Sequence, residues 1–413
     1  MPLVLLIAIA IFQSWRLAKT EADPDWAMFN FAAFTGSWYG RDFADCKTPG
    51  IHLYYWLIAK LVGPSIQRVK FVDHFLTALP GCLLWLVDPS KFVVSLIYVS
   101  LINSPHFYAF TGNVGHLAAS LLMMSMISTN PHLAVIFLLA TIFVEPKFLP
   151  AGIAMVAIQG WWQAGPWLIA GLAIAGIIIM VLDRTTDHDK KTLLAWIIES
   201  SVTIPYRMSK YRKELGKWMP WFTSEALLFF LPLVAAAVYA RPEFLFWLPA
   251  LLYLAVITSG FFIRAYHLIP LLPFVAMAGM DPRIATALIL IDFVTCGFYL
   301  GDIWGRHYRL YDQHVKAARD VGNYLKDKPG TIWVNGMHSE VYVYARKPIP
   351  FGLAEQIEIN DVATERREHM LAEWKKQQPE YVVITENPRM EFKPNGYKMI
   401  AEAFNTIVWQ KIV

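Results

Sequence analysis

Long apolar runs alternate with short polar connectors over most of the chain. The connectors "DPSK" (88–91), "STNPH" (128–132) and "GMDPR" (279–283) carry turn residues. A helix needs about 20 apolar residues to cross a bilayer, and several runs are shorter than that. The pattern therefore predicts about eleven membrane helices of uneven length. They are expected at 1–15, 71–87, 91–104, 114–128, 132–145, 147–163, 166–182, 221–239, 243–261, 266–280 and 283–300.

The pattern changes near residue 305, where charged residues become frequent. "QHVKAARDVGNYLKD" (313–327) predicts an amphipathic helix, and "VATERREHMLAEWKKQ" (362–377) predicts another. "TIWV" (331–334) and "YVVIT" (381–385) predict buried strands. Alternating helices and strands are typical of a small α/β unit. This segment has no glycine-rich phosphate loop, which argues against nucleotide binding there.

Composition fits a membrane protein. The chain of 413 residues is 56% hydrophobic and only 16% charged, and its mean hydropathy is +0.41; soluble proteins average roughly 25% charged residues. We expect an all-α polytopic membrane region over 1–304 and a small α/β domain over 305–413. The first run lacks the basic n-region of a signal peptide, so we interpret it as a retained helix. The spacing of Cys46, Cys82 and Cys296 indicates neither a disulfide framework nor a metal site.

Two long loops interrupt the apolar runs, at 16–70 and 183–220. Within the first, "IHLYYWLIAKL" (51–61) mixes aromatic, basic and aliphatic residues, which predicts a helix lying in the membrane interface. Both long loops then share one face with the 105–113 turn, the 145–147 turn, the 263–267 turn and the C-terminal region. Because the 183–220 loop is rich in Lys and Arg, the positive-inside rule would place this face in the cytoplasm. The charge pattern alone leaves the orientation undecided.

The first loop opens with "ADPDWAMF", which combines a helix start with two carboxylates. Asp23 fits an N-cap and Pro24 the first helical position. Capping explains Asp23 without any catalytic role. Asp25 is not needed as a cap, although it complements the helix dipole. Near a membrane surface, either carboxylate is able to take a proton from an acceptor hydroxyl.

A charge cluster follows in "YGRDFADCKTPGIHL", which holds Arg41, Asp42 and Lys47 before the Pro49–Gly50 turn. Such clusters are commonly solvated loops. At headgroup depth, however, the cations suit an anionic lipid phosphate. His52 lies just beyond the turn. Asp73, His74 and Asp292 lie within apolar runs, where polar groups are costly and usually face the protein interior.

These segments together resemble the first extracytoplasmic loop of the GT-C glycosyltransferases, most closely the bacterial relatives of protein O-mannosyltransferase and aminoarabinose transferase. In that group the loop begins with an essential Asp, usually followed by Glu, and carries a Lys-Pro-Pro-like turn. The matching residues are Asp25 and Lys47. "SPHFYAFTGNVGHLAASLLMM" (104–124), "FVEPKF" (143–148) and "FFIRAYHLIPLLPFVAMAG" (261–279) resemble later segments of the family. They contribute His116, then Lys147, and then Arg264, Tyr266 and His267.

The resemblance implies transfer of a hexosyl or pentosyl group from a polyprenyl-phosphate donor to an acceptor hydroxyl outside the cytoplasm, with inversion. It implies a multi-pass protein of the bacterial inner membrane that glycosylates the cell envelope. Asp25, with Asp23 as the alternative, is the expected base. The donor phosphate is expected to meet Lys47, Arg264, Lys147, His267 and Arg41. Tyr266, His116, Asp42 and His52 are further candidates.

The chain departs from the family pattern in two places. Asp23-Pro24-Asp25-Trp26 replaces the usual acidic pair, and no acid lies between Ser104 and His116. Divalent cations prefer several oxygen ligands, so we expect a site without a metal or other cofactor. Glycan, lipid and protein acceptors remain open, and no nucleic acid is expected. The alternatives are a lipid flippase or transporter, which should show inverted repeats, and a non-catalytic lipid-binding subunit.

Overall fold

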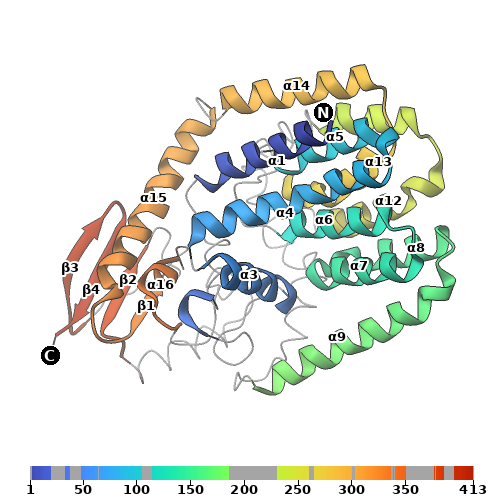
Figure 1. Ribbon diagram of the computed structural model, residues 1–413. Helices are drawn as coiled ribbons and strands as arrows, with labels where there is room; N and C mark the ends of the chain where they lie inside the picture. The colour runs from blue at the N-terminus through green and yellow to red at the C-terminus, as the bar shows by residue number, and fades with distance from the viewer. Residues whose placement is uncertain are drawn as a thin grey trace. The chain divides into compact units, whose positions relative to one another are not determined.

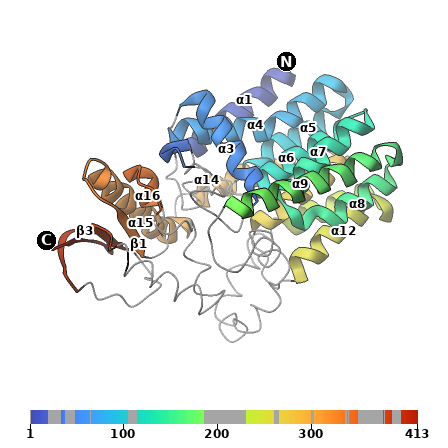
Figure 2. The same ribbon diagram turned by 90° about the horizontal axis from the view of Figure 1, so that it is seen from below.

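The computed structural model describes most of the chain in two compact units (Figures 1 and 2). The first comprises Met1–Thr20, Gln67–Ile179 and Leu194–Gly301, and the second Glu21–Ile66, Met180–Leu193 and Asp302–Val413. The residues described are 2–19, 33–37, 48–63, 65–104, 114–185, 230–259, 265–299, 303–335, 338, 340–349, 376, 378–385 and 395–412.

The first unit is a layered bundle of apolar helices (Figure 1). Every predicted apolar run contains a helix, so this part of the prediction is confirmed. The α-helices are α1 (Pro2–Ala18), α4 (Ile66–Val87), α5 (Phe92–Ile102), α6 (Val114–Ile127), α7 (Pro131–Val144), α8 (Leu149–Ile158), α9 (Gly165–Thr185), a helix over Phe230–Ala240, α12 (Phe244–Ser259), α13 (Leu272–Met277) and α14 (Pro282–Tyr299). Within the described residues, 3₁₀ turns join them: η1 (Pro89–Lys91), η3 (Pro146–Phe148), η4 (Trp162–Ala164) and η5 (Ala265–Leu271).

The predicted connectors act as helix starts. The Asn130 side chain accepts hydrogen bonds from the backbone N–H groups of His132 and Leu133, and Pro131 occupies the first position of α7. The Asp88 carboxylate likewise accepts from the N–H of Ser90 at the start of η1. These contacts satisfy backbone donors that a helix start leaves without intrahelical partners.

The lengths of the described helices bear on the predicted membrane spans. Among the described helices, α4 alone has the length and apolar composition to cross a bilayer. Shorter apolar helices of 10–17 residues make up most of the rest of the first unit. The predicted number of spans therefore stays a prediction.

Gly81 lets α4 approach α5 closely. A Cβ atom built on Gly81 would lie 2.6 Å from Cγ2 of Val99 and 3.2 Å from the backbone oxygen of Ser95. Both neighbours belong to the buried face of α5, and Val99 is fully buried. An added methyl group therefore has to displace backbone or tightly packed core atoms.

Gly81→Ala is expected to lower the free energy of unfolding by about 1–3 kcal/mol through overpacking. Thermal unfolding in detergent measures the loss. Gly176→Ala in α9 is the matched control, since no atom lies within 4 Å of its added Cβ. Alanine is more favourable than glycine in a helix by up to about 1 kcal/mol, so this variant should be as stable as the wild type or more stable. Equal unfolding midpoints for the two variants would contradict the close packing of α4 on α5.

The second unit contains a four-stranded mixed sheet in the order β1-β2-β4-β3. β1 (Ile332–Asn335) and β2 (Tyr381–Ile384) are parallel, whereas β4 (Thr406–Lys411) runs antiparallel to β2 and to β3 (Tyr397–Ala403). Helices α15 (Ile303–Lys326) and α16 (Glu340–Ala345) pack with Val334, Val383 and Val408 in one core, and Figure 2 shows both helices on one side of the sheet.

Part of the long first loop belongs to this second unit. Helix α3 (Pro49–Val62) confirms the helix predicted at 51–61. Phe34 and Trp56 pack against the core formed by α15, α16 and the sheet. The segments on either side of Lys47 are thus connected to the α/β core.

The C-terminal prediction is correct for the helix at 313–327 and for both strands, with three differences. Helix α15 begins at Ile303, ten residues before the predicted start at Gln313. Helix α16 and the hairpin of β3 and β4 were not predicted. The helix predicted at 362–377 lies outside the described residues, apart from helical Lys376.

Candidate active site

The predicted site residues divide between the described and undescribed parts of the chain. Six of them lie outside the described residues: Asp23, Asp25, Arg41, Asp42, Lys47 and Arg264. Tyr266 lies in η5, but its side chain is outside the described part. His116, Lys147 and His267 belong to the first unit, and His52 is a buried residue of α3 in the second.

Helix α4 carries a buried polar face. Lys70, Asp73, His74 and Thr77 follow the spacing i, i+3, i+4, i+7, which places them on one side of a helix. None of them is more than 2% exposed. Such groups are costly inside an apolar helix and are kept where they pair with one another or serve a function. Asp73 and His74 were singled out from the sequence and Lys70 was not, although the same helical spacing includes it.

His74 connects the start of α4 to the end of α5. Its Nδ1 lies 3.1 Å from Oδ1 of Asn103, and Nδ2 of Asn103 donates to the backbone oxygen of His74 at 2.7 Å. The Tyr98 hydroxyl donates to the backbone oxygen of Thr77 at 3.1 Å. These buried contacts fix the pairing of the two helices, because breaking them leaves polar atoms without partners.

His116 adds the start of α6 to this group. It is buried and lies close enough to His74 for the two imidazoles to interact electrostatically. Its Nε2 atom is buried and has no hydrogen-bond partner within the described part of the chain. The polar side chains thus come from the start of α4, the end of α5 and the start of α6, at one end of these helices. The alternation of spans predicts this placement.

A second polar contact connects α5 with α14. The Ser104 hydroxyl donates a hydrogen bond to the buried carboxylate of Asp292. Asp292 therefore faces the protein interior, as predicted for a polar group within an apolar run.

Lys147 lies in η3, between α7 and α8. Its Nζ is 3.6 Å from Oε1 of Glu145, and their side chains are 18% and 4% exposed. The carboxylate therefore restrains the only slightly exposed ammonium group. Glu145, two residues before Lys147 in "FVEPKF", was not among the predicted site residues.

Three predicted residues belong to elements that pack together. η5, which holds His267, contacts α6, which holds His116. Both η5 and η3, the element of Lys147, contact α12.

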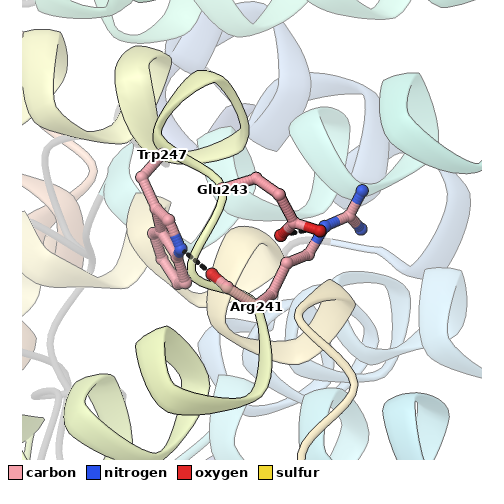
Figure 3. Close-up of polar contacts among 3 residues, drawn as sticks. All are labelled: Arg241, Glu243 and Trp247. Atoms are coloured by element: carbon pink, nitrogen blue, oxygen red, sulfur yellow. Dashed lines mark hydrogen bonds and ion pairs between the residues drawn. The ribbon is translucent and has the colours of Figure 1, made fainter.

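The polar turn before α12 is exposed, unlike the buried polar groups described above (Figure 3). Nε1 of Trp247 donates to the backbone oxygen of Arg241 at 2.6 Å, and Nε of Arg241 lies 3.6 Å from Oε2 of Glu243. The Arg241 and Glu243 side chains are 42% and 67% exposed. Exposed ion pairs contribute little free energy, so we interpret this group as a turn that fixes Trp247 rather than as part of a site.

Metal binding gains no support from the described side chains. Among them, no group of three or more His, Cys, Asp or Glu residues has the arrangement of a metal site. The expectation of a site without a metal remains a prediction, because the acidic residues of the first loop lie outside this part.

Comparison with known proteins gives matches among solved structures alone. No family model and no curated protein sequence matches the chain. ArnT from Cupriavidus metallidurans in the apo state is similar, with a TM-score of 0.49 and 15% identity over 98% of this chain and 97% of that chain. The same protein bound to undecaprenyl phosphate gives a TM-score of 0.47 and 14% identity over the same shares.

Proposed function

We propose that this protein is a membrane glycosyltransferase that transfers a monosaccharide from a polyprenyl-phosphate donor to an acceptor hydroxyl on the extracytoplasmic face. The observation that carries this proposal is the first-loop sequence, with Asp25 after the first apolar helix and Lys47 just before Pro49 and Gly50. Pro49 and Gly50 were predicted to form a turn, but they begin helix α3. The packing of η5 on α6, and of η3 and η5 on α12, supports the proposal, because His267, His116 and Lys147 lie on these elements.

The proposed reaction is a single displacement at the anomeric carbon. The acceptor oxygen forms a bond to that carbon while the bond from the carbon to the phosphate oxygen breaks. Asp25 takes the proton of the acceptor hydroxyl, which is the task of a general base. The electron pair of the broken bond leaves with the phosphate. Attack from the side opposite the leaving group inverts the configuration of the sugar.

Cations around the leaving phosphate stabilise the charge that grows in the transition state. Lys47 and Arg264 are assigned this role, with Lys147, His267 and Arg41 as further contributors. The ion pair with Glu145 keeps the ammonium of Lys147 from moving freely. A restrained cation loses less conformational entropy when the phosphate binds. No metal ion is part of the proposed reaction.

Helix α3 suits a place at the membrane interface. Its Ile51, Tyr55 and Ile58 are buried, whereas Leu53, Leu57 and Leu61 are 55%, 48% and 83% exposed. Leucines four residues apart form an apolar stripe on one side of the helix, as in helices that lie on a bilayer. We assign this stripe to the lipid. Because Lys47 is two residues before the start of α3 in the sequence, we propose that it meets lipid phosphates at headgroup depth.

The proposed setting is the bacterial inner membrane, with the site outside the cytoplasm and the cell envelope as the location of the acceptor. The buried Lys70, Asp73 and His74 of α4 are also compatible with a lipid transporter. The two functions differ in one observable respect, since a transporter leaves the bond between sugar and phosphate intact.

Transfer of a radiolabelled sugar by the purified protein tests the proposal. Synthetic polyprenyl-phosphate donors carrying different hexoses and pentoses are offered together with an envelope extract as the acceptor source. We expect the label to move to acceptor material and free polyprenyl phosphate to accumulate in equal amount. Lipid movement across vesicles with no bond cleavage from any donor would instead favour the transporter.

A further inference from the structure

The hairpin turn between β3 and β4 contains a bulky residue in an unfavourable backbone conformation. Ala403 pairs with Thr406, which leaves Phe404 and Asn405 as a two-residue turn. Their φ angles are +37° and +31°. Turns of this kind favour Asn or Gly, and a bulky residue at positive φ is strained. Strain that a protein retains often marks a functional position.

The Phe404 ring is accessible and begins a row of rings that leads to a buried carboxylate. The side chain is 41% exposed. Its ring packs edge-on against His314 of α15, with 4.7 Å between ring centroids. His314 stacks on His338 at 5.6 Å and an interplanar angle of 14°, and Nδ1 of His338 lies 2.7 Å from Oε1 of Glu340. Both histidines and Glu340 are buried.

Two threonines lie across the end of the sheet on the same side as these rings. The register pairs Ile384 with Ile407, so Thr385 and Thr406 are the next residues opposite each other. By strand alternation they share the face of Val383 and Val408, which α15 and α16 cover. Both threonines are buried, and Thr406 directly follows the strained turn.

Three oxygen atoms in this group are buried without a hydrogen-bond partner. Within the described part of the chain these are Oε2 of Glu340, Oγ1 of Thr385 and Oγ1 of Thr406. A buried polar atom without a partner costs about 1–3 kcal/mol. They come from the start of α16, the end of β2 and the start of β4, the strand that follows the Phe404 turn. The unpartnered oxygens and the strained turn are two independent signs of a site at this corner.

We propose that this corner, made of the Phe404 turn, Thr385, Thr406 and Glu340, binds a neutral, hydroxyl-rich saccharide, the acceptor of the transfer reaction. The identification of this saccharide as the acceptor rests on the proposed function, whereas its binding at this corner does not. The exposed ring offers a flat apolar surface for a sugar face. Sugar hydroxyls both donate and accept hydrogen bonds, which matches one carboxylate oxygen and two threonine hydroxyls.

Charge distinguishes this ligand from the donor. A phosphate group would meet the carboxylate of Glu340, and like charges at close range repel. An apolar lipid surface would use the Phe404 ring but would leave the three oxygens without partners. A neutral saccharide fits both features. The oxygens become reachable when the turn moves, and strain at Phe404 lowers the cost of that movement.

The test uses two substitutions in the full-length protein that preserve or improve folding while removing a ligand contact. Phe404→Asn relieves the backbone strain, because Asn tolerates positive φ. Thr406→Val removes a buried hydroxyl that has no partner and keeps the side chain's shape. We expect unfolding midpoints in detergent that equal or exceed the wild-type value for both variants. A third variant, Phe404→Leu, keeps the apolar character of the side chain and the backbone strain but removes the flat ring.

Calorimetric titration with neutral gluco-, galacto- and manno-oligosaccharides, and with an anionic hyaluronan fragment, measures binding. We expect a neutral oligosaccharide to bind the wild type. Phe404→Asn and Phe404→Leu are expected to weaken its affinity about tenfold or more, as for an aromatic residue at the centre of a site. Thr406→Val is expected to weaken it as well.

Several results would overturn the proposal. One is an oligosaccharide affinity equal to that of the wild type in Phe404→Asn or in Phe404→Leu. Wild-type affinity in Phe404→Leu would show that apolar character is enough without the flat ring, which would favour a lipid contact. Another is binding of the anionic fragment alone, or of no oligosaccharide at all. The assay contains no donor, so it measures binding of the saccharide apart from any transfer. Saccharide binding without any transfer would contradict the proposed reaction and support the saccharide site. Transfer without Phe404-dependent binding would support the reaction and contradict the saccharide site.

Discussion

Asp25→Asn is expected to lower the rate of sugar transfer by about 10²- to 10⁴-fold, the usual contribution of a positioned general base. Asparagine has nearly the shape of aspartate but has no basic carboxylate to accept the acceptor's proton. Donor binding does not involve this proton, so the KM for the donor should change little. Initial rates with a radiolabelled polyprenyl-phosphate sugar, measured over a range of donor concentrations, separate kcat from KM.

Asp23→Asn is the matched control for this prediction. Asn and Asp cap a helix about equally well, so the change leaves the predicted helix start after Asp23 intact. If Asp23 only caps, Asp23→Asn should retain the wild-type rate. Loss of transfer in Asp23→Asn together with normal transfer in Asp25→Asn would move the base to Asp23. Normal transfer in both variants would remove the acid–base role altogether and favour a lipid-binding subunit or a transporter.

The apolar pattern was sufficient to predict the helices of the first unit. Asp88 with Pro89, and Asn130 with Pro131, interrupt the aliphatic runs, and these local signals fixed the turns at 88–91 and 128–132. The start of α15 was harder to predict. Gly305 lies in the first turn of α15, and glycine costs about 1 kcal/mol in a helix. The predicted helix therefore began only where the amphipathic repeat became clear.

Contacts between distant segments were beyond this kind of prediction. The β3–β4 turn contains Phe404 and Asn405, whereas sequence rules look for Asn-Gly or Asp-Gly between two strands. With Phe404 at the first turn position, the sequence lacks the residue pair that signals such a turn. Packing of Phe34 and Trp56 on the α/β core joins positions hundreds of residues apart, which no local periodicity encodes.

The site was predictable in its residue types more than in its arrangement. His116, Lys147 and His267 were chosen through the family resemblance, and the packing of α6, η3, η5 and α12 relates their elements. Lys70, Asn103 and Glu145 were missed, because each makes sense only through a contact. Asn103 hydrogen-bonds to His74, and Glu145 pairs with Lys147. Lys70 belongs to the polar face of α4, which the i, i+3, i+4 spacing would have revealed.

Lys47→Met is expected to reduce kcat/KM for the donor about 10- to 100-fold. A hydrogen bond to a charged group contributes about 1.5–3 kcal/mol, and each 1.4 kcal/mol corresponds to a factor of ten. Methionine keeps an unbranched apolar side chain and removes the ammonium. The phosphate is already charged in the bound donor and gains more charge as it leaves. Loss of the Lys47 ammonium should therefore raise the KM for the donor and lower kcat. Titration of polyprenyl phosphate, the product, measures the binding part separately.

Lys60→Met provides the control within the same segment. Lys60 lies in the last turn of α3, and its Nζ is 5.4 Å from the centre of the Trp56 ring. This substitution removes the same charge from the same loop, so a general electrostatic attraction to the donor should suffer equally in both variants. A specific contact should suffer in Lys47→Met alone, and Lys47→Arg should restore part of the affinity because the charge is kept. Equal loss in both methionine variants, abolished by salt, would reduce Lys47 to one of several cations that attract the lipid without selecting its phosphate.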